Sequence, residues 1–179
     1  MVFGGSVCQP LPVRILVRAA RREDLSALVR LRLANAKRHI ELDPTAHRLP
    51  DADAVHRYFQ DVLAAPATAD VLMLVAEASG QVVGMAEVVM LPEPPDHQIL
   101  VPRRAAQIHT VVLEDYRGKG VGQALVAAAE HAAADRGISI LIAPISAPNT
   151  DALDFYARAG FGEHGILLRK TPGGTTTDA

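Results

Sequence analysis

Three glycines alternate with other residues in the segment 117–122, which has the sequence Arg-Gly-Lys-Gly-Val-Gly. Because glycine has no Cβ, successive backbone N–H groups can turn toward one anion, and a ligand can approach the chain closely. An Ala-rich stretch with helical periodicity follows, so the positive end of a helix dipole would face the same anion. Arg117 and Lys119 add positive charge. The segment therefore predicts a binding site for a phosphate or pyrophosphate group.

Two widespread phosphate-binding motifs fit this turn poorly. A P-loop requires Ser or Thr after Gly-Lys, whereas Gly120 follows Lys119 here. A dinucleotide-binding fingerprint requires G-x-G-x-x-G after the first strand of the domain, whereas this turn has the spacing G-x-G-x-G and lies late in the chain. A glycine-rich turn without a ligand is a further alternative. It is disfavoured because each glycine inside a helix costs about 1 kcal/mol of helix stability.

The segment 112–122, Val-Leu-Glu-Asp-Tyr-Arg-Gly-Lys-Gly-Val-Gly, resembles the acetyl-CoA-binding motif of the GNAT superfamily of N-acetyltransferases. That motif has the form Arg/Gln-x-x-Gly-x-Gly/Ala and is matched by Arg117, Gly120 and Gly122. The resemblance implies direct transfer of the acetyl group of acetyl-CoA to a primary amine of a small molecule or peptide.

A second signature of the same family is similar to the segment 149–161, Asn-x-x-Ala-x-x-x-Tyr-x-x-x-Gly-Phe. Asn149 matches a family asparagine that contacts the cofactor arm. The same residue can instead cap the helix that follows it, with Asp151 in the favoured first turn. The two roles are compatible, and together the two signatures make the resemblance specific over residues 108–161.

The resemblance implies how acetyl-CoA is held. In this family the fourth strand carries a bulge where it parts from the fifth, and its freed backbone groups bond the pantetheine arm and the thioester carbonyl. The amides of the glycine turn hold the pyrophosphate, and no metal ion takes part. The implied cofactor-binding residues are Thr110, Val111, Val112, Arg117, Gly118, Lys119, Gly120, Val121, Gly122, Gln123 and Asn149.

Tyr156 matches the family tyrosine that protonates the leaving thiolate. A thiol titrates at a pKa of about 8.5 and a phenol at about 10, so a positioned tyrosine hydroxyl can release its proton as the C–S bond breaks. The alternative is a core tyrosine that packs beneath its own helix.

Two residues are candidates for the base that removes a proton from the acceptor amine. Glu87 lies on the third predicted strand and His109 on the fourth, and both flank the expected cleft. Positions 106 and 108, where some family members carry a catalytic acid or histidine, are Ala106 and Ile108 here. The choice between Glu87 and His109 stays open, and the family mechanism relies mainly on holding amine and thioester together.

Two loops are expected to shape the acceptor site. Residues 39–50 and residues 92–102 are rich in proline and carry several histidines and carboxylates. His39, Asp43 and His47 in the first loop could also suggest a metal site, but their wide spacing makes this a weak signal. The acceptor itself is not identified by these residues.

The expected elements place these residues in one α/β domain over residues 13–170. Hydrophobic periodicity predicts a mixed, mostly antiparallel central sheet with helices on both faces. Residues 1–12 are expected to form a disordered lead-in and residues 171–179 a disordered tail. The predicted strands are 13–19, 71–77, 81–91, 105–113, 138–143 and 166–170; the predicted helices begin near residue 22 and cover 51–64, 119–136 and 149–159.

Composition excludes several classes of protein. The 179 residues carry a net charge of −2 and 4% aromatic residues, which is not the basic, stacking surface that binds nucleic acid. Cys8 is the single cysteine, so an intramolecular disulfide or a cysteine-rich metal site cannot form. Apolar runs are far shorter than the roughly 20 residues of a membrane helix. We expect a cytoplasmic protein, and the family resemblance also suggests a homodimer.

Two other functions remain as alternatives to an N-acetyltransferase. One is an acyl-CoA sensor or regulatory module with weak or no catalysis, which the lack of an obvious base would explain. The other is a dinucleotide-dependent enzyme, which ranks last because its glycine spacing differs.

Overall fold

The computed structural model describes residues 14–66, 70–168 and 170. The lead-in and tail predicted at the two ends lie outside these residues. Five strands form one sheet in the order β1-β2-β3-β4-β5. Neighbouring strands are antiparallel except β4 and β5, which are parallel. The strands are β1 (Ile15–Ala19), β2 (Val71–Ala78), β3 (Gln81–Met90), β4 (Ala105–Val112) and β5 (Ile140–Ile142).

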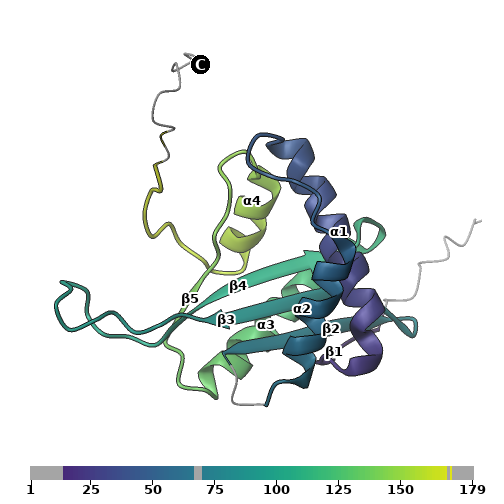
Figure 1. Cartoon of the computed structure of the whole chain (residues 1–179), viewed down its shortest axis with the longest axis horizontal. Coiled ribbons are helices and arrows are strands. Elements are labelled where there is room, and N and C mark those ends of the chain that lie inside the picture. The colour runs from purple at the N-terminus through teal and green to yellow at the C-terminus, as the bar shows by residue number, and fades with distance from the viewer. Residues whose placement is uncertain (1–13, 67–69, 169, 171–179) are drawn as a thin grey trace, which may run out of the picture.

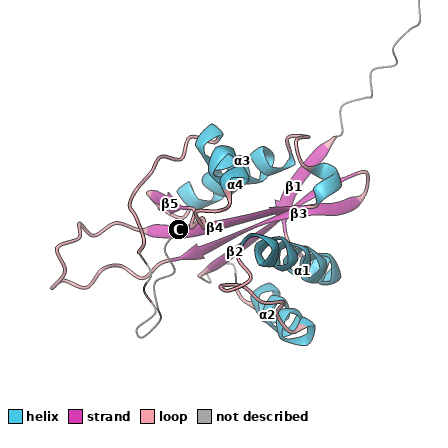
Figure 2. Cartoon of the chain, turned by 90° about the horizontal axis from the view of Figure 1, so that it is seen from above, coloured by secondary structure: helices cyan, strands magenta, loops and turns pink. Residues whose placement is uncertain are grey.

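Four helices cover both faces of this sheet. Figure 2 shows α1 (Leu25–Leu42) and α2 (Ala52–Ala64) on one face, and α3 (Val121–Ala134) and α4 (Thr150–Arg158) on the other. The predicted fold class, a mixed sheet between helical layers, is confirmed. A dinucleotide-binding fold requires parallel βαβ units, and the antiparallel order of β1 to β4 does not provide them.

Each face of the sheet has its own hydrophobic core. Phe59 and Leu28 are fully buried between the sheet and the helices α1 and α2, whereas Leu125 is fully buried beneath α3. Along β4, Ile108 belongs to the α3 side and Val111 to the α1 side, as the alternation of side chains along a strand requires. Residues of β4 with even numbers therefore face α3 and α4, and those with odd numbers face α1 and α2.

Two expectations about the elements are wrong. Residues 39–42 belong to the last turns of α1 instead of a loop, because the proline at position 44 restricts only the residue before it. The strand predicted over 166–170 is absent from the described residues 166–168 and 170. Leu167 has an exposed fraction of 98%, and a groove of about 1120 Å³ separates this segment from β5. A strand needs a neighbour to supply hydrogen bonds, and this segment has none.

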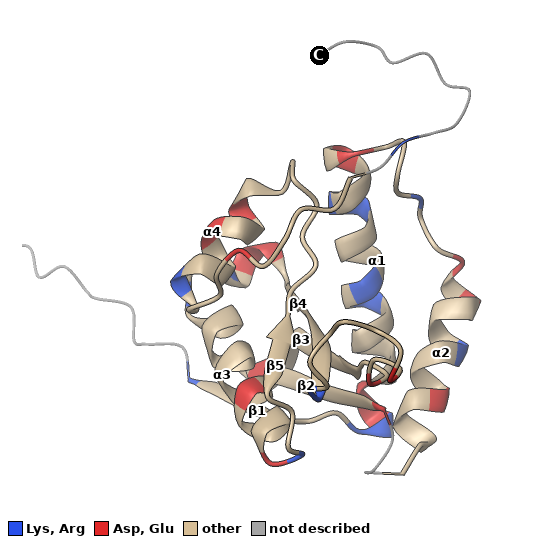
Figure 3. Ribbon diagram, turned by 90° about the vertical axis from the view of Figure 1, so that its left-hand side faces the viewer, with Lys and Arg blue, Asp and Glu red and all other residues tan. Residues whose placement is uncertain are grey.

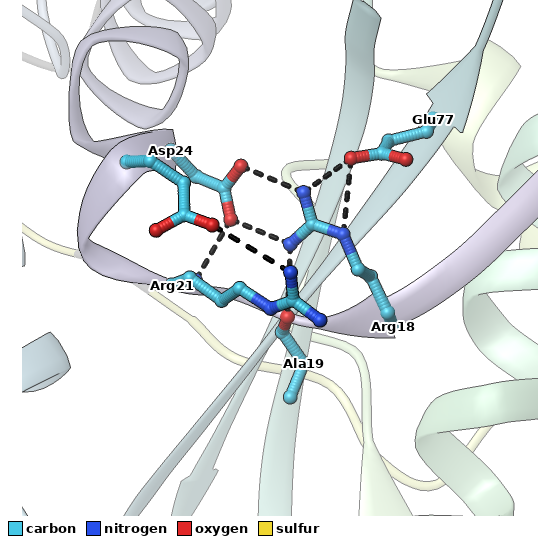
Figure 4. A network of polar contacts seen from close by, with 6 residues as sticks. Arg18, Ala19, Arg21, Asp24 and Glu77 are labelled. Carbon is cyan, nitrogen blue, oxygen red and sulfur yellow. Dashed lines mark hydrogen bonds and ion pairs between the residues drawn. The ribbon is translucent and has the colours of Figure 1, made fainter. Parts of the chain in front are cut away.

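An arginine with two carboxylate partners joins β1, β2 and the start of α1 (Figure 4). Arg18 donates two hydrogen bonds to the carboxylate of Asp24, at 2.7 and 2.9 Å, and its Nε lies 3.0 Å from Oε1 of Glu77. Asp24 is buried and also accepts a hydrogen bond from the backbone N–H of Arg21 at 2.7 Å. These bonds, above all those from Arg18, lower the pKa of Asp24 against the opposing effect of its burial.

We expect Asp24→Ala to lower the free energy of unfolding by about 3 kcal/mol, because it leaves a partly buried guanidinium without its main partner. Urea denaturation measures this difference, and exposed Glu23→Ala is the control, expected to change stability by less than about 0.5 kcal/mol. Because the folded pKa of Asp24 lies below its unfolded value, its contribution is present above a pH of about 4 and is lost as the pH falls further. Equal stability of Asp24→Ala and wild type at neutral pH would contradict this account.

Candidate active site

The glycine turn joins β4 to α3 and has the backbone geometry of an anion-binding loop. Gly118 and Gly120 have positive φ angles of 70° and 83°, a region that favours glycine. Gly120 is the N-cap of α3. Since glycine has no side chain with which to cap the helix, the first N–H groups of α3 remain available to a ligand. Arg117 and Lys119 are exposed beside them.

Gly122 connects this turn to the second signature. A Cβ atom at this position would lie 2.9 Å from Cε2 of Phe155, in α4. Real Cβ atoms do not approach so closely, so a larger residue here would require the ring of Phe155 to move. The two sequence signatures are therefore in contact on the same side of the sheet.

The strands β4 and β5 part after a short pairing. β5 pairs only with residues 105–107 of β4, so residues 108–112 have a strand neighbour on the β3 side alone. The register between β3 and β4 runs without interruption from Gly84 opposite Val112 to Met90 opposite Ala106. The expected parting of the strands is present, but the expected bulge in β4 is not. The register shift in this sheet lies instead in the pairing of β2 with β3, where Ala76 faces Gly84, Glu77 faces Val82, and Val83 of β3 is the extra residue.

Hydrogen bonds to β3 decide which backbone groups of β4 face the open side. Leu113 N–H bonds to the carbonyl of Val83, and Ala105 accepts from Leu91. Since hydrogen-bonded pairs alternate along an antiparallel ladder, Val111 also directs its backbone groups toward β3. Thr110 and Val112 direct theirs toward the open side. The structure therefore brings Thr110 and Val112, but not Val111, to the position expected for cofactor-binding backbone groups.

Tyr156 reaches this open side of β4 from α4. Its side chain is 7% exposed and packs edge-on against the rings of Phe155 and Phe161. Its hydroxyl donates a hydrogen bond to Oγ1 of Thr110 at 3.2 Å. Burial raises the pKa of Tyr156, and the contact with Thr110 opposes this shift in part. The phenol therefore keeps its proton at neutral pH, as a proton donor must.

Asn149 is the N-cap of α4. Its Oδ1 accepts a hydrogen bond from the N–H of Ala152 at 3.3 Å. The capping role considered from the sequence is therefore present in the structure. Capping uses the side-chain oxygen and leaves the amide NH₂ group for another partner.

Glu87 and His109 lie on the other face of the sheet, directly opposite each other on β3 and β4. Glu87 is 3% exposed, and both of its carboxylate oxygens are occupied. Arg32 of α1 donates to Oε2 at 2.7 Å, and the hydroxyl of Tyr58 in α2 donates to Oε1 at 2.5 Å. Because both oxygens already accept hydrogen bonds, this carboxylate is better placed to orient its neighbours than to meet a substrate.

His109 has the properties of a base. Burial lowers its pKa, the charge of Glu87 raises it, and the charge of Arg32 lowers it; burial is the largest effect. The imidazole is therefore neutral at neutral pH, with a lone pair that can accept a proton. Figure 3 shows that the helices on the two faces of the sheet carry both basic residues (Lys, Arg) and acidic residues (Asp, Glu).

Two residues of this site, Arg32 and Tyr58, were not predicted from the sequence. Arg32 lies one helical turn after Leu28, on the buried side of α1, and its guanidinium lies 5.3 Å from the centroid of the Phe59 ring. A charged residue at an apolar position of an amphipathic helix is a signal for a buried ion pair. Nothing in the sequence indicates that Tyr58 is its neighbour in the site.

No group of three or more potential metal ligands is present among the described residues. No helix in the described ranges is long and apolar enough to span a membrane.

Comparison with known proteins agrees with this geometry. Residues 26–161 match the acetyltransferase (GNAT) family. An uncharacterised N-acetyltransferase of Methanocaldococcus jannaschii is 36% identical over 66 residues, which cover 36% of this chain and 29% of that protein.

Solved structures share the fold. A transcriptional regulator from Bacillus halodurans superposes with a TM-score of 0.67 at 24% identity, over 88% of this chain and 99% of that one. An aminoglycoside N-acetyltransferase in complex with CoA superposes with a TM-score of 0.67 at 19% identity, over 92% of this chain and 99% of that one. Glucosamine-6-phosphate N-acetyltransferase from Arabidopsis thaliana superposes with a TM-score of 0.62 at 17% identity, over 89% of this chain and 99% of that one. With a family match over most of its length, the chain belongs to the acetyltransferase (GNAT) family, and the acetyl-CoA-dependent N-acetyl transfer predicted from its sequence is confirmed at the level of that family.

Proposed function

We propose that this chain transfers the acetyl group of acetyl-CoA directly to a primary amine of a small molecule or peptide. The observation that carries the proposal is the hydrogen bond from Tyr156 to Thr110. It places a protonated phenol at the open side of β4, on the same face as the glycine turn. A thioester beside Thr110 would have a proton donor for its sulfur within reach.

The N–H groups of residues 118–123 would hold the pyrophosphate, and the backbone groups of Thr110 and Val112 would hold the pantetheine arm and thioester carbonyl. Arg117 and Lys119 would add charge from the exposed side of the turn. Lys119 lies over the ring of Tyr116, 5.3 Å from its centroid, which restricts where its ammonium can lie. The amide NH₂ of Asn149 would reach the cofactor arm while its oxygen caps α4. The side chain of Val121 is buried in the core, so this residue would contribute through its N–H alone.

His109 would take the proton that the acceptor ammonium must lose before it attacks. The nitrogen then forms the C–N bond, the C–S bond breaks, and Tyr156 gives its proton to the departing sulfur. As the amide forms, the nitrogen gives a second proton to the phenolate of Tyr156, and this restores the phenol. One of the two protons thus ends on the thiol and the other leaves to solvent through His109. Glu87 would act on His109 by its charge, with Arg32 and Tyr58 fixing its position.

We expect Gly120→Ala to weaken CoA binding about tenfold, because a left-handed conformation costs a residue with Cβ about 1–2 kcal/mol. The nearest heavy atom to a Cβ at this position is 3.9 Å away, so the effect would come from the backbone and not from a clash. Isothermal titration calorimetry with CoA measures it. Gly162→Ala is the matched control, since a Cβ there meets no atom within 4 Å and φ is not positive. Equal CoA affinity for both variants would contradict a role for this turn.

The proposed reaction is tested by acetyl-CoA-dependent release of free thiol over a panel of amines. The panel includes neamine, glucosamine 6-phosphate and a peptide with a free N-terminus, since two of the enzymes with this fold act on amino sugars. Thiol release with at least one amine, and an N-acetylated product by mass spectrometry, support the proposal. Tight binding of CoA without turnover on any amine would favour an acyl-CoA sensor. No CoA binding would contradict both functions.

A further inference from the structure

Residues 166–168, with the sequence Ile-Leu-Leu, form an apolar segment that is exposed to solvent. Each of the three residues has an exposed fraction of 88% or more. In Figure 1 the segment follows α4 and runs away from the sheet instead of joining it. A contiguous group of large apolar side chains on a protein surface commonly marks a place where another molecule binds. The segment therefore lacks the neighbour that would bury it.

The strand β5 has an open edge. It is the last strand in the order of the sheet, so among the described residues only β4 pairs with it. Its three residues, Ile140, Leu141 and Ile142, are all apolar and half-buried. Natural edge strands are usually protected by a charged side chain, a proline or a bulge, and these three residues include neither a charge nor a proline. The free backbone groups of this edge can therefore pair with an added strand.

The groove of about 1120 Å³ runs along β5 and is also bordered by α4 and by residues 160–167. Because Ile166 and Leu167 form part of its wall, the same chain's segment borders this space and does not fill it. Much of the lining is apolar, whereas its carboxylates, with no Lys or Arg beside them, are Glu130, Asp154 and Glu163. The segment 166–168 is followed at position 170 by an exposed lysine. An apolar strand with a basic end thus complements a groove with apolar walls and an acidic rim.

We infer that two copies of this chain form a dimer in which residues 166–168 of each copy add an antiparallel strand to β5 of the other. Each copy gives one strand and receives one, so the interface is two-fold and closed. With Leu167 opposite Leu141, antiparallel pairing puts Lys170 opposite Ile138, at the end of the groove that Glu130 lines. Tyr156 borders the same groove, so the partner's strand would also cover this side of α4. The dimer does not depend on acetyl transfer, and its test is independent of the proposed reaction.

Sedimentation velocity over a concentration series tests the dimer. Wild type is expected to form a species with twice the mass of one chain. Leu167→Asp puts a charge into the proposed interface and is expected to raise the dimer Kd at least about tenfold, because a charge is costly to bury. Since Leu167 is almost fully exposed in the single chain, this variant should keep the wild-type circular dichroism spectrum. Leu49→Asp, at an exposed leucine outside the groove, is the matched control and should keep the wild-type Kd.

Two charge reversals distinguish exchange between copies from pairing within one chain. Glu130→Lys and Lys170→Glu each place like charges together at both ends of the dimer and are expected to weaken it about three- to tenfold. A mixture of the two variants allows a heterodimer in which both contacts again join opposite charges, so the mixture should recover the wild-type affinity.

Three results would overturn the inference. The first is a wild type that stays monomeric throughout the series, as expected if the segment pairs with β5 of its own chain. The second is a dimer that Leu167→Asp does not weaken. The third is a pair of charge variants that associate as wild type does when alone, or that recover no affinity when mixed.

Discussion

Replacement of Tyr156 by phenylalanine is expected to lower kcat by a factor of about 10² to 10⁴, the usual contribution of a positioned proton donor. The ring and its contacts with Phe155 and Phe161 are kept, so the core beneath α4 should remain intact. Only the hydroxyl that bonds to Thr110 is lost. CoA affinity measured by calorimetry should therefore stay within about threefold of wild type, since that hydrogen bond contributes roughly 1 kcal/mol at most.

Tyr116→Phe is the matched control for this prediction. Tyr116 lies beside the glycine turn and keeps its contact with Lys119 through the ring alone, so this variant should retain full turnover. An unchanged kcat in Tyr156→Phe would show that the leaving thiolate takes its proton from another source. A loss of CoA affinity equal to the loss of kcat would show that Tyr156 is a core residue and not a proton donor.

Replacement of His109 by glutamine is expected to lower kcat/KM by a factor of about 10² to 10⁴ near neutral pH. The wild-type kcat/KM should rise with pH through the folded pKa of His109 and level off above it, because the base must be neutral. Since burial lowers that pKa, the midpoint of the rise should lie below the ordinary value of about 6.5. The rise should be absent in His109→Gln, which has no imidazole to titrate.

Glu87→Gln separates the two candidates for the base. Because the negative charge of Glu87 raises the pKa of His109, removing that charge should move the acid limb of the pH profile to lower pH. Turnover on the plateau should fall less than in His109→Gln. If Glu87 were the base, Glu87→Gln would abolish the pH dependence and His109→Gln would retain it. Urea denaturation of Glu87→Gln is the necessary control, because this change leaves the partly buried guanidinium of Arg32 without its charged partner.

The parts of the site that the sequence predicted are local in the chain. The glycine turn could be identified because the glycines, the two basic residues and the following helix are contiguous. The cap formed by Asn149 and the helix after it follow from the same kind of short-range pattern. The assignment of Glu87 and His109 to adjacent strands also held, because the alternation of buried side chains restricts how β3 and β4 can pair.

What the sequence did not predict depends on contacts between distant residues. The pairing of Arg32 and Tyr58 with Glu87 joins residues 55 and 29 positions apart, and only the packing of α1 and α2 on the sheet brings them together. The orientation of Val111 toward β3 depends on the ladder and not on its residue type. The missing strand after α4 has the composition of a strand, but strand formation needs a neighbour. The position of His39 depends on the extension of α1 by one turn beyond the expected end.

A crystal structure of this chain with CoA bound tests the central claim most directly. We expect the pyrophosphate to lie on the N–H groups of residues 118–123, and the sulfur to lie within hydrogen-bond distance of the Tyr156 hydroxyl on the open side of β4. The space between the sulfur and His109 should remain open to an amine. A pyrophosphate bound away from the glycine turn, or a sulfur on the far side of the molecule from Tyr156, would contradict it.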